Sequence, residues 1–213
     1  MRTEYPSDLP LQVARDRYFA VNHFGDDGGY SSAWVDFKLG PIPFPFPNSP
    51  ARVRAVRFHD LHHVLTEYAT DFLGELEISA WEIGAGCKRN LFAWQINLGG
   101  LAGGMLFAPR RTSAAFFRGQ HSQTLYERDY EQLLGSTVGE VRAQVGLAAT
   151  TSRPSARSIL LLIAATLLGL CIGVLQFALL LPLVPVGILM NVLRARAERN
   201  TPRAGTRNPS EVK

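Results

Sequence analysis

Two histidines and two acids stand at spacings that could hold a metal ion. Residues 59–63 read His-Asp-Leu-His-His, and eleven residues separate His63 from Glu75. On a helix His59 and His63 lie one turn apart on the same face, and Asp60 lies about 100° around from His59. Imidazole nitrogens and carboxylate oxygens without a thiolate suit zinc in an open, catalytic type of site, although iron or manganese accepts the same set. We therefore predict a metal site to which His59, Asp60 and His63 contribute, closed by Glu75.

Three nearby polar residues are placed outside the predicted ligand set. His62 lies about 60° to the other side of His59 on the same helix. Glu67 continues the stripe of His59 and His63 by one turn and is a physically possible ligand, but a solvated acid near the helix end is the simpler interpretation. Glu82 shares a helical face with Glu75, seven residues earlier. It is a candidate for supporting the ligands or facing substrate, and a plain surface carboxylate is the alternative.

The spacing of the two histidines, Asp60 and Glu75 resembles a metal motif of a known protein family. The pattern His-Asp-x-x-His, eleven residues and Glu, with Gly74 directly before the glutamate, resembles the metal motif of the coenzyme Q (ubiquinone) biosynthesis protein four family. The segment from Tyr126 to Leu147 is similar to the aromatic-acidic segment and short basic helix that close the domain in that family. The likeness spans residues 50–147, and the first 48 residues do not match. It implies that the ligands are His59, Asp60, His63 and Glu75.

The resemblance also implies a reaction and its partners. Family membership would place the chain in ubiquinone biosynthesis, removing the C1 carboxyl of a polyprenylated hydroxybenzoate ring and adding a hydroxyl. The implied cofactor is a divalent metal, zinc above others, and the implied partners are a polyprenylated aromatic lipid, a membrane and other quinone-biosynthesis enzymes. Zinc does not exchange electrons, so the oxidative half needs oxygen reacting with the activated ring or a redox metal.

Two other functions stay open at this point. One is a non-catalytic scaffold that binds a prenylated lipid and organises the biosynthetic enzymes around a structural metal. The other is a metal-dependent hydrolase of a membrane-borne substrate. Such a hydrolase is expected to carry further His and Asp ligands at separated positions, and the only histidines outside the motif are His23 and His121.

Helix signals place the motif residues on particular elements. Ser49 can cap the free amides of a helix that begins at Pro50 and runs through the motif to about Tyr68. A second helix from about Asp71 to Gly84 carries Glu75 and Glu82, and a third covers about Leu91 to Phe107. We therefore predict an all-α metal-binding domain.

Two further groups are candidates for substrate contact. The third helix carries four glycines, which tight helix packing explains most simply and which a smooth groove for a flat or polyprenyl ligand would also use: Gly99, Gly100, Gly103 and Gly104. Arg110 and Arg111 follow directly and offer paired guanidinium groups suited to a carboxylate or phosphate.

Composition divides the chain into four parts. Residues 1–48 are predicted to form an irregular N-terminal arm, with a short helix near Leu11 to Phe24 and extended stretches at Tyr30 to Lys38 and Pro41 to Pro47. We predict that residues 49–150 form the helical metal-binding domain, residues 158–191 a membrane segment and residues 192–213 a basic disordered tail.

The formal charge of +4 comes entirely from residues 191–213. The acidic and basic residues before this tail are equal in number, which argues against a nucleic-acid groove. Two cysteines predict no disulfide framework.

The membrane segment is the longest apolar stretch. Ile159 to Met190 is 32 residues without a charge. One helix of that length measures about 48 Å, against a hydrocarbon core of about 30 Å. Arginines flank both ends, so both flanks carry the signal that keeps a loop in the cytoplasm. We predict a transmembrane or re-entrant helical hairpin bent around Leu175 to Pro182, with the domain and the tail on the cytoplasmic side of the cell membrane.

Overall fold

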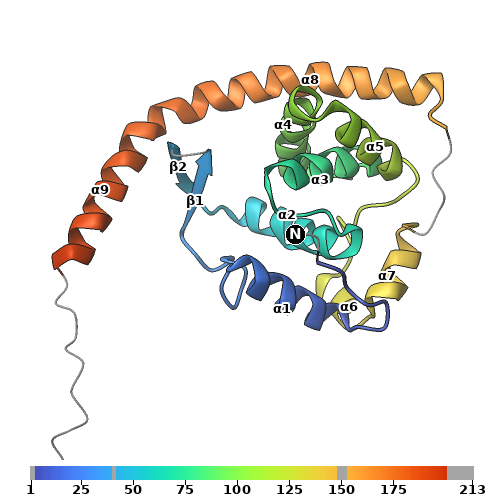
Figure 1. Ribbon diagram of the computed structural model, residues 1–213, viewed down its shortest axis with the longest axis horizontal. Helices are drawn as coiled ribbons and strands as arrows, with labels where there is room; N and C mark the ends of the chain where they lie inside the picture. The colour runs from blue at the N-terminus through green and yellow to red at the C-terminus, as the bar shows by residue number, and fades with distance from the viewer. Residues whose placement is uncertain (1–2, 40–41, 148–152, 201–213) are drawn as a thin grey trace, which may run out of the picture. The chain divides into compact units, whose positions relative to one another are not determined.

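The structure, a computed structural model, describes residues 3–39, 42–147 and 153–200 (Figure 1). These residues are mostly helical, as predicted. The chain divides into two compact units, Met1–Ala33 with Asn48–Phe177, and Trp34–Pro47 with Ala178–Lys213. The first unit contains α1 (Leu11–Asn22), α2 (Pro50–Thr66), α3 (Phe72–Ala85), α4 (Leu91–Phe107), α5 (Pro109–Gly119), α6 (Tyr130–Leu134), α7 (Val138–Gln144) and α8 (Ala156–Leu180) as far as Phe177. The second contains the antiparallel pair β1 (Trp34–Leu39) and β2 (Ile42–Pro47), the single turn η1 (Leu181–Leu183) and α9 (Val184–Asn200).

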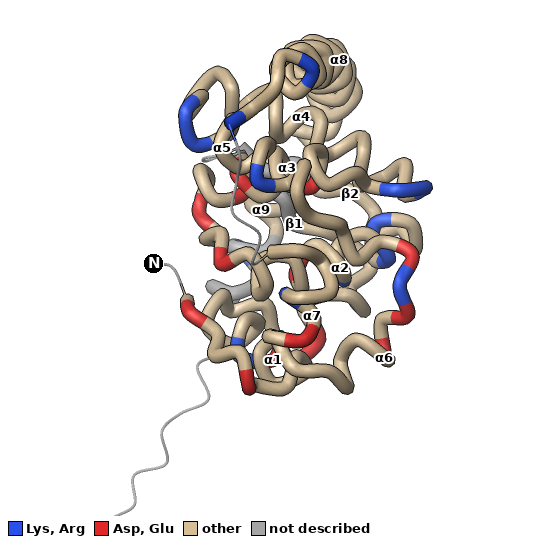
Figure 2. The backbone as a smooth tube through the Cα atoms, turned by 90° about the vertical axis from the view of Figure 1, so that its right-hand side faces the viewer, with Lys and Arg blue, Asp and Glu red and all other residues tan. Residues whose placement is uncertain are grey.

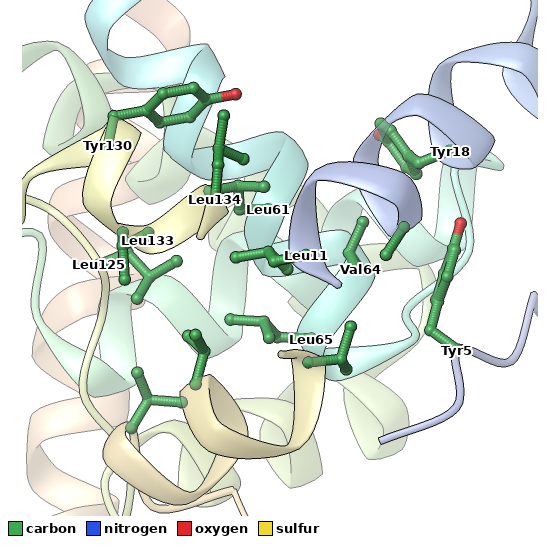
Figure 3. Packing of buried hydrophobic residues seen from close by; sticks show 14 of the residues in the cluster. Tyr5, Leu11, Tyr18, Leu61, Val64, Leu65, Leu125, Tyr130, Leu133 and Leu134 are labelled. Carbon is green, nitrogen blue, oxygen red and sulfur yellow. The ribbon is translucent and has the colours of Figure 1, made fainter. Parts of the chain in front are cut away.

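Helix α2 lies between two hydrophobic clusters of the first unit. It begins as predicted, with Pro50 as its first residue and with the Ser49 hydroxyl accepting the Arg52 N–H at 3.2 Å. Every residue from Asp60 to Thr66 is buried. On one side α1, α6 and α7 pack against Leu61, Val64 and Leu65, as Figure 3 shows. On the other side lies the second cluster, formed mainly by α3, α4 and α5. Asp60 and His63 of the candidate motif therefore lie inside the unit, whereas the side chains of His59 and Glu75 are 20% and 45% exposed.

Paired glycines fix α3 against α5. A Cβ on Gly84 would stand 2.2 Å from the carbonyl oxygen of Phe116, and a Cβ on Gly119 would stand 2.2 Å from that of Trp81. Only residues without a side chain let the two backbones come this close. Because α3 carries Glu75 and Glu82, this contact helps to fix both acids in the unit.

The N-terminal residues belong to the core of the first unit. Tyr5, Leu11 and Tyr18 are buried in the cluster around α2. The Leu11 N–H donates to the Ser136 carbonyl at 2.8 Å, and the Val138 N–H donates to the Leu9 carbonyl at 2.9 Å. The short helix predicted near Leu11 is present as α1, but the separation of an irregular arm at residue 48 is wrong for residues up to Ala33.

A single arginine ties α7 to the end of α2. The Arg142 guanidinium donates to the carbonyls of Leu65 at 2.9 Å and Val64 at 3.3 Å, and to that of Tyr5 at 3.0 Å. It also pairs with the Glu67 carboxylate at 2.6 Å. A cation at a helix C-terminus satisfies free carbonyls and favours the helix dipole. This contact holds the end of α2 that carries His63.

The predicted hairpin is not present. Helix α8 continues to Leu180, the turn η1 covers Leu181–Leu183, and α9 begins at Val184. The backbone at Leu180 and Val184 stays in the right-handed helical region, so the chain does not turn back there. The helical run Ala156–Leu193 is long and apolar enough to cross a membrane. Helix α9 continues to Asn200, so residues 192–200 are helical rather than disordered, and residues 201–213 lie outside the described part. Pro182 is accommodated in η1, where a proline fits near the start of a helical turn.

Candidate metal centre

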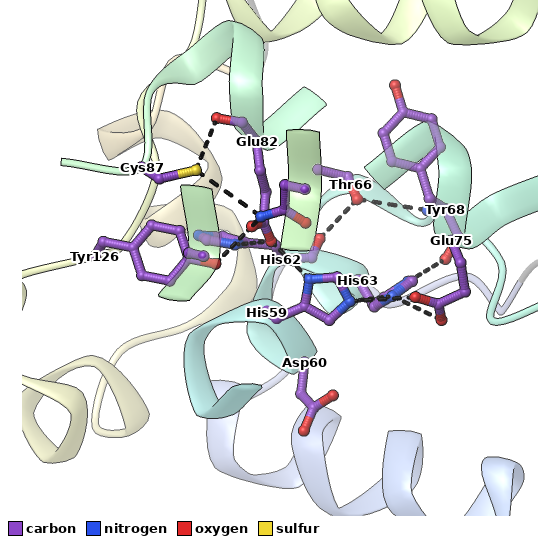
Figure 4. A network of polar contacts seen from close by, with 12 residues as sticks. His59, Asp60, His62, His63, Thr66, Tyr68, Glu75, Glu82, Cys87 and Tyr126 are labelled. Carbon is purple, nitrogen blue, oxygen red and sulfur yellow. Dashed lines mark hydrogen bonds and ion pairs between the residues drawn. The ribbon is translucent and has the colours of Figure 1, made fainter. Parts of the chain in front are cut away.

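Three of the four predicted ligands meet at one point in the first unit. His59 and His63 of α2 and Glu75 of α3 present ligand atoms that all lie within 4.8 Å of one another (Figure 4). The two Nε2 atoms are 3.2 Å apart. The His59 Nε2 is 3.3 Å from Oε2 of Glu75, and the His63 Nε2 is 3.3 Å from Oε1 of the same carboxylate. The cluster is partly accessible to solvent, because the His63 side chain is 1% exposed whereas those of His59 and Glu75 are 20% and 45% exposed.

The spacing of these atoms fits a metal ion. Four ligands at about 2.0–2.1 Å from a tetrahedral zinc stand about 3.3–3.4 Å apart. The two Nε2 atoms are 3.2 Å apart, close to that value, and each faces a different oxygen of the Glu75 carboxylate at 3.3 Å. Taken as one ligand atom per residue, the three atoms lie within 4.8 Å of one another, which is compact enough to surround one ion. Three protein ligands would leave the fourth position open, which is the arrangement of catalytic rather than structural zinc sites.

Both histidines are oriented by hydrogen bonds at their other nitrogen. The His63 Nδ1 lies 3.0 Å from the Tyr68 carbonyl, which can only accept, so this nitrogen carries the proton. The His59 Nδ1 lies 2.8 Å from the Glu82 carboxylate and donates to it. Each Nε2 therefore presents a lone pair to the cluster when its ring is neutral. Metal-binding histidines typically have such a second partner.

Glu82 is the centre of a buried polar network. Its side chain is fully buried and accepts hydrogen bonds from His59 Nδ1 and His62 Nδ1, both at 2.8 Å, from the Tyr126 hydroxyl at 2.5 Å and from the Asn97 amide. None of these four donors is a lysine or an arginine. Burial by itself raises the pKa of Glu82, but His59 and His62 outweigh it and hold the pKa well below its usual value. A buried carboxylate of this kind needs a positive charge close by, which a metal ion or an imidazolium supplies.

His59 lies between two carboxylates. Burial lowers the pKa of His59, but Glu82 on one side and Glu75 on the other outweigh that effect and raise the pKa well above its usual value. The position of the ring thus favours a cation, either a proton on the imidazole or a metal ion at Nε2. Glu82 therefore acts on a predicted ligand, as expected for an outer acid, and is not a surface carboxylate.

His62 lies outside the ligand set, as the helix geometry predicted. The Leu125 N–H donates to its Nε2 at 2.8 Å, so its Nδ1 carries the proton and donates to Glu82. Both ring nitrogens are therefore used within the core. Burial lowers the pKa of His62, which agrees with a neutral ring.

Asp60 does not join the cluster, which corrects the predicted ligand set. Its carboxylate points away from the two histidines (Figure 4) and accepts hydrogen bonds from Tyr30 at 2.5 Å and from Tyr18 at 3.4 Å. The physical reason is the turn of about 100° that separates it from His59 on the helix. That turn directs Asp60 towards the N-terminal residues of the first unit. Burial raises the pKa of Asp60 to about 6.

Glu67 is also placed away from the cluster. It is the C-cap of α2 with φ of 60°, and its carboxylate accepts from Arg142 and from the Tyr5 N–H at 3.2 Å. It is not a metal ligand, and it is an ion-paired acid at the helix end rather than a merely solvated one.

A tight connection brings α3 back beside α2. Asp71 caps α3, its carboxylate accepting the Gly74 N–H at 2.8 Å. A Cβ on Gly74 would stand 2.0 Å from the Ala69 carbonyl oxygen. The glycine before Glu75 therefore has a steric function, since it allows the close approach that places Glu75 opposite His63.

The weak substrate candidates are largely engaged in packing. Gly100 faces the Ser79 hydroxyl, and Gly104 faces the Thr112 side chain, so α4 packs closely there against α3 and α5. Gly99 lies near the Gln176 side chain and Gly103 near Leu76. Arg111 makes a two-pronged pair with Glu77 at 2.9 and 2.6 Å, while Arg110 is exposed. None of these residues joins the candidate cluster of His59, His63 and Glu75.

Sequence reasoning missed the residues that complete the networks. Asn97 and Tyr126 bind Glu82 from segments 15 and 44 residues away, and Tyr18 and Tyr30 bind Asp60 from 42 and 30 residues away. Tyr126 belongs to the segment noted for its resemblance, which was the one available signal. No family model, curated protein or solved structure was found to match this chain.

Proposed function

We propose that the first unit is a metal-dependent enzyme of ubiquinone biosynthesis that decarboxylates and hydroxylates C1 of a polyprenylated hydroxybenzoate ring at a membrane. The observation that carries the metal part is the cluster of His59, His63 and Glu75, whose ligand atoms lie within 4.8 Å of one another. The reaction rests on the resemblance of the motif to the ubiquinone-biosynthesis family. Asp60 is not included among the ligands, because it is bound by two tyrosines.

The proposed centre assigns a task to each residue. His59, His63 and Glu75 would hold the ion, and the bound ion would supply a Lewis acid that stabilises negative charge on a ring oxygen or carboxylate. Glu82 would keep the Nδ1 proton on His59, and Asn97 and Tyr126 would keep Glu82 in place. The Tyr68 carbonyl would do the same for His63. In the overall change the C1–carboxyl bond breaks and releases CO₂, and a C1–OH bond forms. This is a two-electron oxidation of the ring, and with molecular oxygen as the oxidant one O₂ and one H₂O are consumed and one H₂O₂ is released.

The reaction is tested by the intermediates that accumulate in cells. A strain without the gene should accumulate a prenylated ring that still carries its carboxyl, and the wild-type gene should remove it. His59→Ala should not restore quinone although the protein is abundant, because it deletes a proposed ligand. His121→Ala, the loss of an exposed imidazole, is the matched control and should restore quinone fully. Full restoration by His59→Ala would favour a scaffold without chemistry.

A further inference from the structure

One face of α8 packs against the other helices of the first unit. Leu162 and Gly169 are buried, and a Cβ on Gly169 would stand 2.1 Å from the Leu98 carbonyl oxygen of α4. Further along α8, the Gln176 amide donates to the Gln95 carbonyl at 3.5 Å. The covered positions recur at alternating spacings of three and four, as one face of a helix does: Leu162, Ala165, Gly169, Ile172 and Gln176. Helix α8 therefore lies across the surface of the first unit over about 21 Å.

The rest of α8 is an exposed apolar surface. Leu160 is 66% exposed, Leu167 60% and Val174 71%, and Cys171 is exposed between them. These four positions point away from the covered stripe, since they lie about 120–180° around the helix from Leu162. After the first turn α8 carries no charge, and Figure 2 shows Lys or Arg only near its start. An apolar arc this wide does not stay in water without a partner.

Charged groups of the first unit argue against an arrangement in which α8 crosses a bilayer along its normal. If α8 crossed a bilayer along the bilayer normal, the part of the first unit that packs against the covered stripe of α8 would enter the hydrocarbon together with the helix. The stripe contacts α4 at Leu98 and Gln95. Helix α4 packs in turn against α3 and α5, which carry the Glu77–Arg111 pair and the exposed Arg110. A charge at the bilayer centre carries a large free-energy cost. A helix lying in the interface avoids this cost, because the domain takes the place of its polar face.

We propose that α8 lies in the plane of a lipid bilayer, at the boundary between headgroups and acyl chains of one leaflet, and docks the first unit on that surface. The exposed apolar arc faces the acyl chains. Arg153 and Arg157, both exposed at the start of α8, contact anionic headgroups. The ligand is therefore an anionic lipid surface. This arrangement is independent of the metal centre.

The native Cys171 makes the arrangement measurable. The full-length protein is spin-labelled at Cys171, and at Leu160→Cys, Leu167→Cys and Val174→Cys in a Cys171→Ser background, and bound to vesicles of phosphatidylcholine and phosphatidylglycerol. Depth is read from the accessibility of each label to oxygen and to a water-soluble nickel chelate. The Cys171→Ser protein without any added cysteine is the labelling control. It should stay unlabelled, because its remaining cysteine, Cys87, is buried and burial raises the pKa of the Cys87 thiol.

A helix in the plane gives four similar, shallow depths. A crossing helix gives a depth that changes along it, since Leu160 and Cys171 are about 16 Å apart along the axis; that result would overturn the proposal. Two other results would also overturn the proposal. One is a protein that does not bind the vesicles, and the other is a dimer that buries the labels and does not bind the vesicles. Gly169→Leu should separate α8 from the domain and abolish the uniform depth, whereas Gly173→Leu, where a Cβ meets nothing within 4 Å, should preserve it.

Discussion

At the scale of single residues, the site is organised by the carboxylate of Glu82, which is not one of the proposed metal ligands. Glu82 binds one proposed ligand, His59, and one structural histidine, His62, through the same oxygen. Its other oxygen is held by Asn97 and Tyr126. With a divalent ion, the charges of Glu75 and Glu82 would be balanced, while both histidines stay neutral. The network thus explains why a buried acid is tolerated beside the cluster.

Glu82→Gln should therefore weaken metal binding without removing a ligand. A glutamine retains the shape but offers an NH₂ group towards at least one of the N–H donors that Glu82 now accepts. We expect metal affinity to fall about 10- to 100-fold, as for other losses of an outer partner. Competition with a chromophoric chelator measures this change. Glu131→Gln, which alters an exposed acid paired with Arg57, is the control and should bind metal like the wild type.

Asp60→Asn should alter the pH dependence of stability and leave the cluster intact. Burial raises the pKa of Asp60 in the folded protein from 3.8 to about 6, so the folded state binds this proton more tightly than the unfolded state does. Its contribution is then fully present below about pH 4 and is lost as the pH rises to about 6. Asparagine can still accept from Tyr30. The variant should gain stability over the wild type across this window, by up to about 3 kcal/mol.

Urea unfolding of both proteins at a series of pH values checks this expectation. Only the difference between the two curves is informative, because the pKa values of Glu75 and Glu82 are lowered and give the opposite slope. A difference that does not change with pH would mean that Asp60 has the same pKa in the folded and the unfolded protein, which would contradict the raised pKa.

At the scale of elements, the centre depends on how closely α3 returns to α2. Ser49, Pro50 and Asp71 are readable capping signals, and the helices they begin were predicted within two residues of their observed ends. The close approaches at Gly84 and Gly119 could not be predicted, because they depend on which backbones meet. For the same reason the direction of Asp60 was wrong, since nothing in the sequence placed Tyr18 and Tyr30 beside α2.

Gly74→Ala should disrupt the α2–α3 connection. The added Cβ would stand 2.0 Å from the Ala69 carbonyl oxygen, so the backbone must shift. We expect a loss of about 1–3 kcal/mol in unfolding free energy, together with weaker metal binding. Gly103→Ala is the matched control in a neighbouring helix, where the new Cβ would be 3.5 Å from Leu76. It should be neutral or stabilise by up to about 1 kcal/mol, because alanine favours helix. Equal unfolding free energies for the two variants would contradict this account of Gly74.

At the scale of the whole molecule, the helical fold was predictable and its grouping into units was not. The 3.6-residue pattern and the capping signals indicated α2, α3 and α4, and the apolar stretch indicated α8. The N-terminal residues join the core through backbone hydrogen bonds at Leu9 and Leu11, which leave no pattern in the sequence. The hairpin was inferred from charge at both flanks, whereas α8 is continuous and covered on one stripe by the domain. The cytoplasmic location stays a prediction.

The most direct test is the metal content of four purified full-length proteins, measured by plasma mass spectrometry after dialysis. The wild type and Asp60→Asn should each carry about one ion, zinc foremost, per chain, while His63→Ala and Glu75→Ala should carry none, because each removes one of three ligands. Full metal content in Glu75→Ala, or loss of metal in Asp60→Asn alone, would contradict the assigned centre.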